Sequence, residues 1–156
     1  MGDNKQALEN FQMLCNYLDE GKYHYNKVSD SRIQFKLNGD DLEIDVRFSI
    51  DSDRALINLY SSLPFTVSKN TRDDMALAIS YLNYHLVDGS FDYDYRNGFI
   101  CFRLTTVYRD SIISKTTFDY MLDISANTVD LYNDKLFYIS QGKMSLDEFK
   151  EFIEED

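Results

Sequence analysis

The sequence predicts an α+β fold in which an antiparallel sheet packs against helices. Two observations indicate the sheet: apolar and polar residues alternate strictly over residues 32–50, and a second pair of alternating segments flanks Asn97-Gly98. A third indicates the helices, because apolar residues recur at helical spacing before, between and after these segments. The predicted order is helix, three strands, helix, two strands, long helix, short helix.

Composition and charge narrow the class of protein. The 156 residues are 44% hydrophobic and carry a net charge of −11, which opposes binding to nucleic acid or an anionic membrane. No apolar run approaches the ~20 residues of a membrane helix, and the N-terminus lacks the basic start and apolar segment of a secretory signal. We therefore expect a cytoplasmic protein that binds neither nucleic acid nor membrane.

The organisation predicted is a single domain over residues 1–156. Its core is expected in about 5–140, followed by a short helix at 145–154, because no repeat or linker interrupts the chain. Cys15 and Cys101 lie far apart in the sequence and are expected to be reduced thiols.

The first half of the chain predicts a helix and then a hairpin. Residues 4–20 have a helical apolar stripe that Gly21 ends, and residues 22–30 form either a short strand or an extended lead-in. In the hairpin at 32–50, the loop is Asn38-Gly39 or Gly39-Asp40. The first loop sets Arg32 opposite Asp45 and Lys36 opposite Asp41, whereas the second sets Arg32 against Arg47. We favour the first loop on charge.

A third strand over residues 54–60 should end before Pro64, which has no N–H for a sheet. Asn70 or Thr71 can cap the next helix, and Asp88-Gly89 closes it. The buried stripe predicted for this helix consists of Met75, Ala78, Ile79, Leu82 and Leu86.

Asn97-Gly98 predicts a two-residue type I′ turn between the last two strands. Arg96 then faces Phe99, which places an aromatic set on one side and Asp92 opposite Arg103 on the other. The aromatic set comprises Phe91, Tyr93, Tyr95, Ile100, Phe102 and Leu104.

Two helices follow. Ser114 should cap a long helix that runs to about Ser140, and Gly142 breaks it. Ser145 and Glu148 have the spacing of a capping box, which opens a short last helix with an apolar side.

The order of elements and the central segment together resemble the YbjN-like family of bacterial sensory transduction regulators. The resemblance covers roughly residues 5–140 and includes Pro64 after the third strand. Its motifs are Leu82-Asn83, Gly89-Ser90-Phe91, Gly98-Phe99-Ile100-Cys101-Phe102-Arg103, Met121-Leu122 and Val129-Asp130-Leu131-Tyr132.

This resemblance implies a fold similar to type III secretion chaperones, a class of small, acidic and often dimeric proteins. It brings no catalytic residues to this chain. The segment beyond Gly142 lies outside the pattern, and its role is open.

No catalytic or metal-binding motif stands out. The chain has no Gly-rich phosphate loop, nucleophile elbow, H-E-x-x-H or C-x-x-C, and its two histidines have no ligand at metal spacing. We therefore expect no cofactor, no metal and no enzymatic activity. An alternative, a small-ligand sensor or enzyme, would use Tyr81, Tyr84 and His85.

The most informative predicted feature is an apolar patch on the wet side of the last hairpin. Phe99 and Cys101 lie there beside Arg103, and Phe149 and Ile153 form a second candidate surface on the last helix. Each surface is either covered by its own chain or used for self-association or a partner.

The function predicted is a non-enzymatic protein-binding or regulatory module, chaperone-like and dimeric, with a protein partner that the sequence does not identify. The alternative within the binding class is a dedicated secretion chaperone for an effector protein.

Overall fold

The strands form one antiparallel sheet in the order β1-β2-β3-β4-β6-β5. The computed structural model describes residues 4–155. The strands are β1 (Asn26–Ser29), β2 (Arg32–Asn38), β3 (Glu43–Asp51), β4 (Leu56–Ser62), β5 (Ser90–Asp94) and β6 (Phe99–Val107). The predicted α+β class is confirmed. Of the two readings of residues 22–30, the strand is correct, so four strands rather than three precede the second helix.

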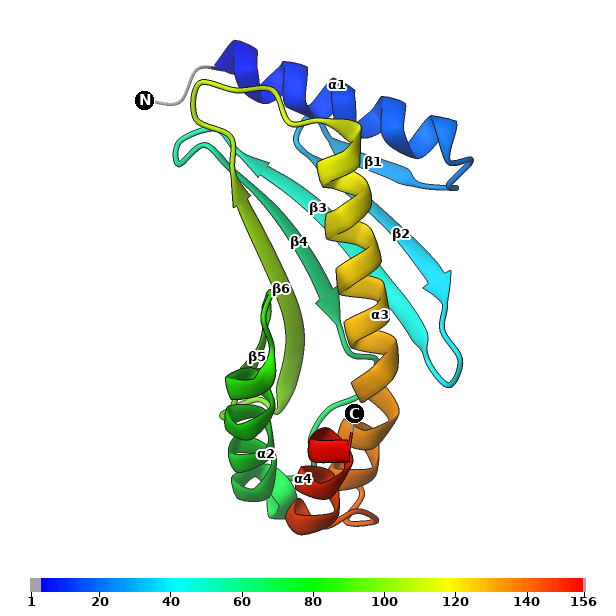
Figure 1. Ribbon diagram of the computed structural model, residues 1–156, viewed down its shortest axis with the longest axis vertical. Helices are drawn as coiled ribbons and strands as arrows, with labels where there is room; N and C mark the ends of the chain where they lie inside the picture. The colour runs from blue at the N-terminus through cyan, green and yellow to red at the C-terminus, as the bar shows by residue number, and fades with distance from the viewer. Residues whose placement is uncertain (1–3, 156) are drawn as a thin grey trace.

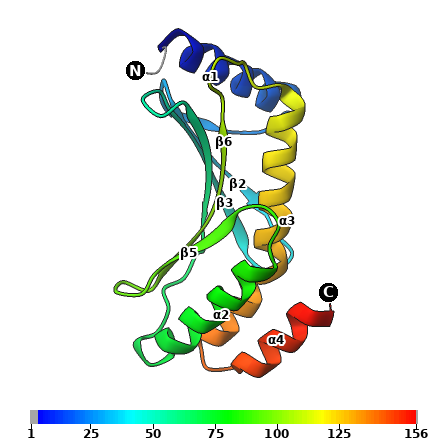
Figure 2. The same ribbon diagram turned by 60° about the vertical axis from the view of Figure 1, so that its left-hand side comes forward.

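The helices cover one side of this sheet (Figures 1 and 2). They are α1 (Asn4–Glu20), α2 (Arg72–His85, after the short 3-10 helix η1, Lys69–Thr71), α3 (Lys115–Ser140) and α4 (Leu146–Glu155). Helix α3 crosses β3, β4 and β6, and α1 packs on β3 and α3. Helix α2 contacts β5, α3 and α4. The opposite side carries no helix from residues 4–155 and is called the open face below.

The core lies between the sheet and α1, α2 and α3. Phe48 of β3 meets Phe118 of α3 edge-on at 6.2 Å between ring centroids, and Phe91 of β5 meets Tyr132 of α3 at 6.4 Å. Burying such a side chain contributes about 1.5–3 kcal/mol. The fully buried residues come from both halves of the chain and include Leu14, Leu18, Ile33, Ile57, Leu59, Met75 and Phe102.

The starts of α3 and α4 follow the predicted signals. Ser114 accepts a hydrogen bond from the Thr117 amide (3.3 Å) at the start of α3. Ser145 and Glu148 form the reciprocal capping box, at 2.7 and 3.1 Å.

At the end of α1, Lys22 rather than Gly21 takes the left-handed conformation, with φ +56°. Helix α2 differs at both ends: the Thr71 side chain at its N-cap makes no capping hydrogen bond, and the helix ends at His85, before the predicted Asp88-Gly89.

The β5–β6 register differs by two residues from the prediction. Asp94 pairs with Phe99 and Phe91 with Phe102, so residues 95–98 form the loop and the two-residue Asn97-Gly98 turn is wrong. The reason is Asp94, whose carboxylate accepts the amide hydrogen bonds of Arg96 (3.0 Å) and Asn97 (3.3 Å) and closes a wider turn. Hydrogen bonds to the carboxylate, first from the Asn97 side chain and backbone and then from the Arg96 backbone, hold the pKa of the Asp94 carboxyl below its usual value.

The β2–β3 hairpin has the same kind of shift. Asn38 pairs with Glu43, so Arg32 lies opposite Ser49 and neither predicted loop is correct. Helix α3 supplies the reason: the Asp130 carboxylate accepts the Asp40 amide at 2.8 Å and lies directly against Gly39. A contact between residues so distant in sequence holds the loop in its wider form.

Strand β4 begins two residues later than predicted. The Asp51 carboxylate accepts the amides of Asp53 (3.0 Å) and Arg54 (2.9 Å), and Ala55 takes a positive φ of 57° before the strand starts. Pro64 lies just beyond the end of β4, as predicted.

Strand β5 is an edge strand, and Asn83 of α2 occupies part of its free edge. The Asn83 side chain accepts the Phe91 amide at 2.8 Å and donates to the Phe91 carbonyl at 3.0 Å. One side-chain amide thus satisfies both backbone groups that a further strand would use at this position.

We predict that Asn83→Ala lowers the free energy of unfolding by about 1–3 kcal/mol, because it leaves the Phe91 amide and carbonyl unpaired. Urea unfolding measures the change. Asn127→Ala on the exposed side of α3 is the matched control and should change stability by less than about 0.5 kcal/mol. Equal effects of the two substitutions would contradict the structural role of Asn83.

We also predict that Phe149→Ala costs about 3–5 kcal/mol, because it empties a fully buried position. Phe99→Ala should cost less than about 1 kcal/mol, since that ring is 58% exposed. Urea unfolding of the two variants measures both losses of stability. A larger loss for Phe99→Ala would reverse the assignment of core and surface.

Candidate functional site on the open face of the sheet

The open face is built from the polar positions of the alternating strands. The pairings set Gln34, Arg47, Tyr60 and Arg103 side by side across β2, β3, β4 and β6. Two residues along the strands, a second row runs from Arg32 across β3 to β6 through Ser49, Asn58 and Thr105. Since adjacent rows on one face lie within side-chain reach, these two rows form one continuous surface.

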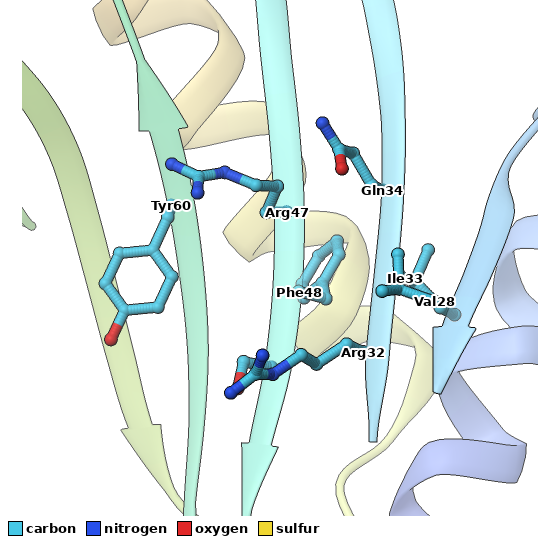
Figure 3. Close-up of a pocket in the computed structure, with 8 residues that line it drawn as sticks. Val28, Arg32, Ile33, Gln34, Arg47, Phe48 and Tyr60 are labelled. Carbon is cyan, nitrogen blue, oxygen red and sulfur yellow. The ribbon is translucent and has the colours of Figure 1, made fainter. Parts of the chain in front are cut away.

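A hollow of about 440 Å³ lies over the β1, β2, β3 and β4 part of this surface (Figure 3). Figure 3 shows the Arg32 side chain crossing from β2 over β3, with Arg47 and Tyr60 beyond it. The residues that line the hollow are Val28, Arg32, Ile33, Gln34, Arg47, Phe48, Ser49 and Tyr60.

The wall of the hollow at the sheet edge comes from an irregularity in β1. Lys27 pairs with Ile33 and Ser29 with Arg32, so Val28 between them is an extra residue without a partner on β2. A bulge of this kind redirects a side chain at the edge of a sheet. Val28 remains 60% exposed beside the hollow.

The cations of the open face differ in how well they are neutralised. Lys36 pairs with Glu43 at 2.5 Å, and Arg103 donates two hydrogen bonds to Asp92, at 2.7 and 3.2 Å. The ion pair with Asp92 raises the pKa of the Arg103 guanidinium further.

Arg47 is only partly satisfied. Its Nε lies 3.0 Å from Asp45 Oδ2 and is enclosed, yet makes no hydrogen bond, while its Nη2 donates to Ser62. The Arg32 side chain has neither an ion pair nor a hydrogen bond with any residue in the described range 4–155. The hollow therefore contains the least neutralised positive charge of the open face.

The predicted residues Phe99, Cys101 and Arg103 lie on the open-face side of β6, on alternate positions of one strand. Phe99 is 58% exposed, so neither α3 nor α4 covers it. Burial raises the pKa of the Cys101 thiol, which keeps it protonated at neutral pH. The three residues form an apolar and basic strip along β6 on the open face.

Phe149 and Ile153 are not surface residues. Phe149 is 0% and Ile153 7% exposed, and the Phe149 ring packs edge-on against Tyr132 at 6.5 Å. Helix α4 docks on α2 and on the end of α3 through this apolar side. Of the two alternatives considered for this side of α4, coverage by the chain itself is correct. Phe149 and Ile153 are therefore not available as a contact surface.

The alternative triad Tyr81, Tyr84 and His85 does not converge on an enclosed site. The Tyr81 hydroxyl donates to Glu154, a bond that raises its pKa, and the His85 Nδ1 lies 2.9 Å from the Tyr81 carbonyl. Tyr84 is 86% exposed. A shallow hollow between α2 and α4 touches Tyr81 and Tyr84 but not His85.

No group of three His, Cys, Asp or Glu side chains within residues 4–155 is placed to hold a metal ion. None of the helices in that range combines the length and the apolar character needed to cross a membrane.

Comparison with known proteins gives a fold likeness. No family model and no curated protein sequence matches the chain. A chain in the crystal structure of the ExsC–ExsE complex is similar to it, with a TM-score of 0.60, 11% identity, and coverage of 83% of this chain and 95% of that chain. At this identity the likeness establishes the fold, and it agrees with the expected similarity to type III secretion chaperones. The YbjN-like resemblance remains a prediction.

Sequence reasoning did not select Arg32, Gln34, Arg47 or Tyr60. The signal was present in the alternation, which places all four on the polar side of their strands. The pairing of Gln34 with Arg47 depends on the wider β2–β3 loop, which the sequence around Gly39 does not reveal by itself.

We predict that Cys101 reacts with iodoacetamide at pH 8 at least about threefold more slowly than N-acetylcysteine, because its raised pKa lowers the thiolate fraction. The rate should rise as the pH increases beyond the usual thiol pKa. Mass spectrometry of the intact chain measures it, and Cys101→Ser gives the contribution of buried Cys15. A rate above that of N-acetylcysteine would indicate an activated thiol instead.

Proposed function

We propose that the protein is a non-enzymatic, chaperone-like module that binds another protein on the open face of its sheet. The observation that carries the proposal is the open face itself, which leaves Phe99 uncovered on a sheet whose other side is fully packed. An aromatic ring left in water at such a position is typical of a contact surface. The fold likeness to a chain solved in the ExsC–ExsE complex supports a protein partner.

The finer assignment is a cytoplasmic regulator of the YbjN-like kind that acts as a homodimer. Exposed apolar residues on and after α2 support self-association, since Leu77 is 58%, Tyr84 86% and Val87 98% exposed. Patches of this kind are less common on proteins that stay monomeric.

A dedicated secretion chaperone for an effector protein is the second candidate. The observation in its favour is that the similar chain was crystallised as part of the ExsC–ExsE complex. The small-ligand reading of Tyr81, Tyr84 and His85 has less support, because those side chains are bonded within the chain or exposed to solvent.

Site-specific photo-crosslinking in the cells that make the protein tests the proposal. A benzoylphenylalanine in place of Phe99 should give one discrete adduct, because that ring would lie in the interface. The same group in place of Leu8, which is 54% exposed on α1, is the matched control and should give none. Mass spectrometry identifies the adduct, and a product of twice the chain mass would mark a second copy.

Absence of an adduct at position 99, or the same set of adducts at both positions, would contradict the proposed binding face. An adduct with a secretion substrate would favour the second candidate over the regulator.

A further inference from the structure

We infer that the hollow between Arg32, Arg47 and Tyr60 receives a carboxylate side chain, an aspartate or glutamate from an extended segment of the bound partner. The inference rests on the proposed function and adds the chemistry of the partner to it. It concerns a different part of the open face from the Phe99 strip, since the hollow lies over β1, β2, β3 and β4.

The sheet register places Arg32 and Arg47 along the lining of the same hollow. Arg32 pairs with Ser49, and Arg47 pairs with Gln34, so the two arginines are diagonal neighbours on adjacent strands. Tyr60 pairs with Arg47 from the other side, on β4. A hollow lined by two cationic side chains favours an anionic group over a neutral or cationic one.

The hollow has a local excess of positive charge that one negative charge would balance. Asp45 pairs with Arg47, whereas Arg32 has no carboxylate within ion-pair distance among residues 4–155. The local excess is therefore about one positive charge on a chain of net charge −11. A carboxylate carries one negative charge and complements this excess, whereas a phosphate dianion would bring two.

The polar groups around the hollow are suited to an oxyanion. Two guanidinium groups, the Tyr60 hydroxyl, the Gln34 amide and the Ser49 hydroxyl can all donate hydrogen bonds. Arginine forms paired hydrogen bonds with carboxylates, a geometry that lysine does not reproduce. The guanidinium groups would repel a cationic partner group at this position.

The bulge in β1 supplies the apolar part of the site. Val28 stands at one wall, where it can contact the methylene groups of a glutamate or aspartate. The hollow of about 440 Å³ is open to solvent on one side, so the backbone of an extended segment can remain outside while one side chain enters. An exposed site of this kind gives weak binding to a single peptide and more as part of a larger interface.

The test uses the full chain and two acetylated, amidated pentapeptides, Thr-Glu-Thr-Glu-Thr and its glutamine counterpart. Titrations followed by amide NMR shifts at low salt should show the glutamate peptide binding at least about tenfold more tightly than the glutamine peptide. The largest shifts should fall on Arg32, Gln34, Arg47 and Ser49. Arg32→Gln and Arg47→Gln should each weaken binding about fivefold or more.

Arg54→Gln is the matched control, because it removes the same charge from an exposed turn outside the hollow. It should change the affinity by less than about twofold. Equal losses for Arg54→Gln and Arg32→Gln, or equal affinity of the two peptides, would overturn the inference. Tighter binding of inorganic phosphate than of the glutamate peptide at the same residues would also overturn it.

Failure here is distinguishable from failure of the proposed function. If the adduct at position 99 forms equally in the wild type and in Arg32→Gln, and the peptide does not bind, the open face still binds a partner but not through this hollow. If neither the adduct nor the peptide complex forms, both proposals fail.

Discussion

The alternation of apolar and polar side chains along β3 is the constraint on which the rest of the structure depends. Ile44, Val46, Phe48 and Ile50 are buried beneath the helices, and the residues between them face solvent. Because β3 lies inside the sheet, its neighbours must alternate in phase with it or bury charge. One side of the sheet thus requires helices to cover it, and the other is free to carry arginine, tyrosine and cysteine.

The same constraint explains which parts of the fold the sequence could predict. The helices, the capping box at Ser145 and the face of each strand follow from local patterns, and they agree with the structure. Both hairpin registers were wrong by an even number of residues, which leaves the side chains that remain in the strands on their own face. Tyr95, predicted on the aromatic side, lies instead in the loop and is exposed. The exact loops depended on Asp94 and on Asp130 of α3, and no local pattern shows that α3 comes to rest on the Gly39 loop.

For the candidate site, too, the sequence predicted which side of each element a residue occupies but not which residues lie next to it. Alternation correctly placed Phe99, Cys101 and Arg103 on the open side of β6. Helical periodicity showed that Phe149 belongs to an apolar side but not what covers that side, and α2 and α3 cover it. Arg32 and Arg47 were not selected, although the preferred register, with Arg32 opposite Asp45, also makes them diagonal neighbours. What local patterns do not show is that both side chains line one hollow, in which Arg32 has no carboxylate partner among residues 4–155.

The two edges of the sheet show how binding can be confined to the open face. At β5, the Asn83 side chain uses the Phe91 amide and carbonyl that another strand would need. At β1, the extra residue Val28 interrupts the pairing and forms a wall of the hollow. Edges that are blocked or bent resist unspecific growth of the sheet. In the proposed complex, side-chain chemistry across the face would select the partner, with apolar area from Phe99 and an unneutralised charge from Arg32, rather than free backbone groups alone.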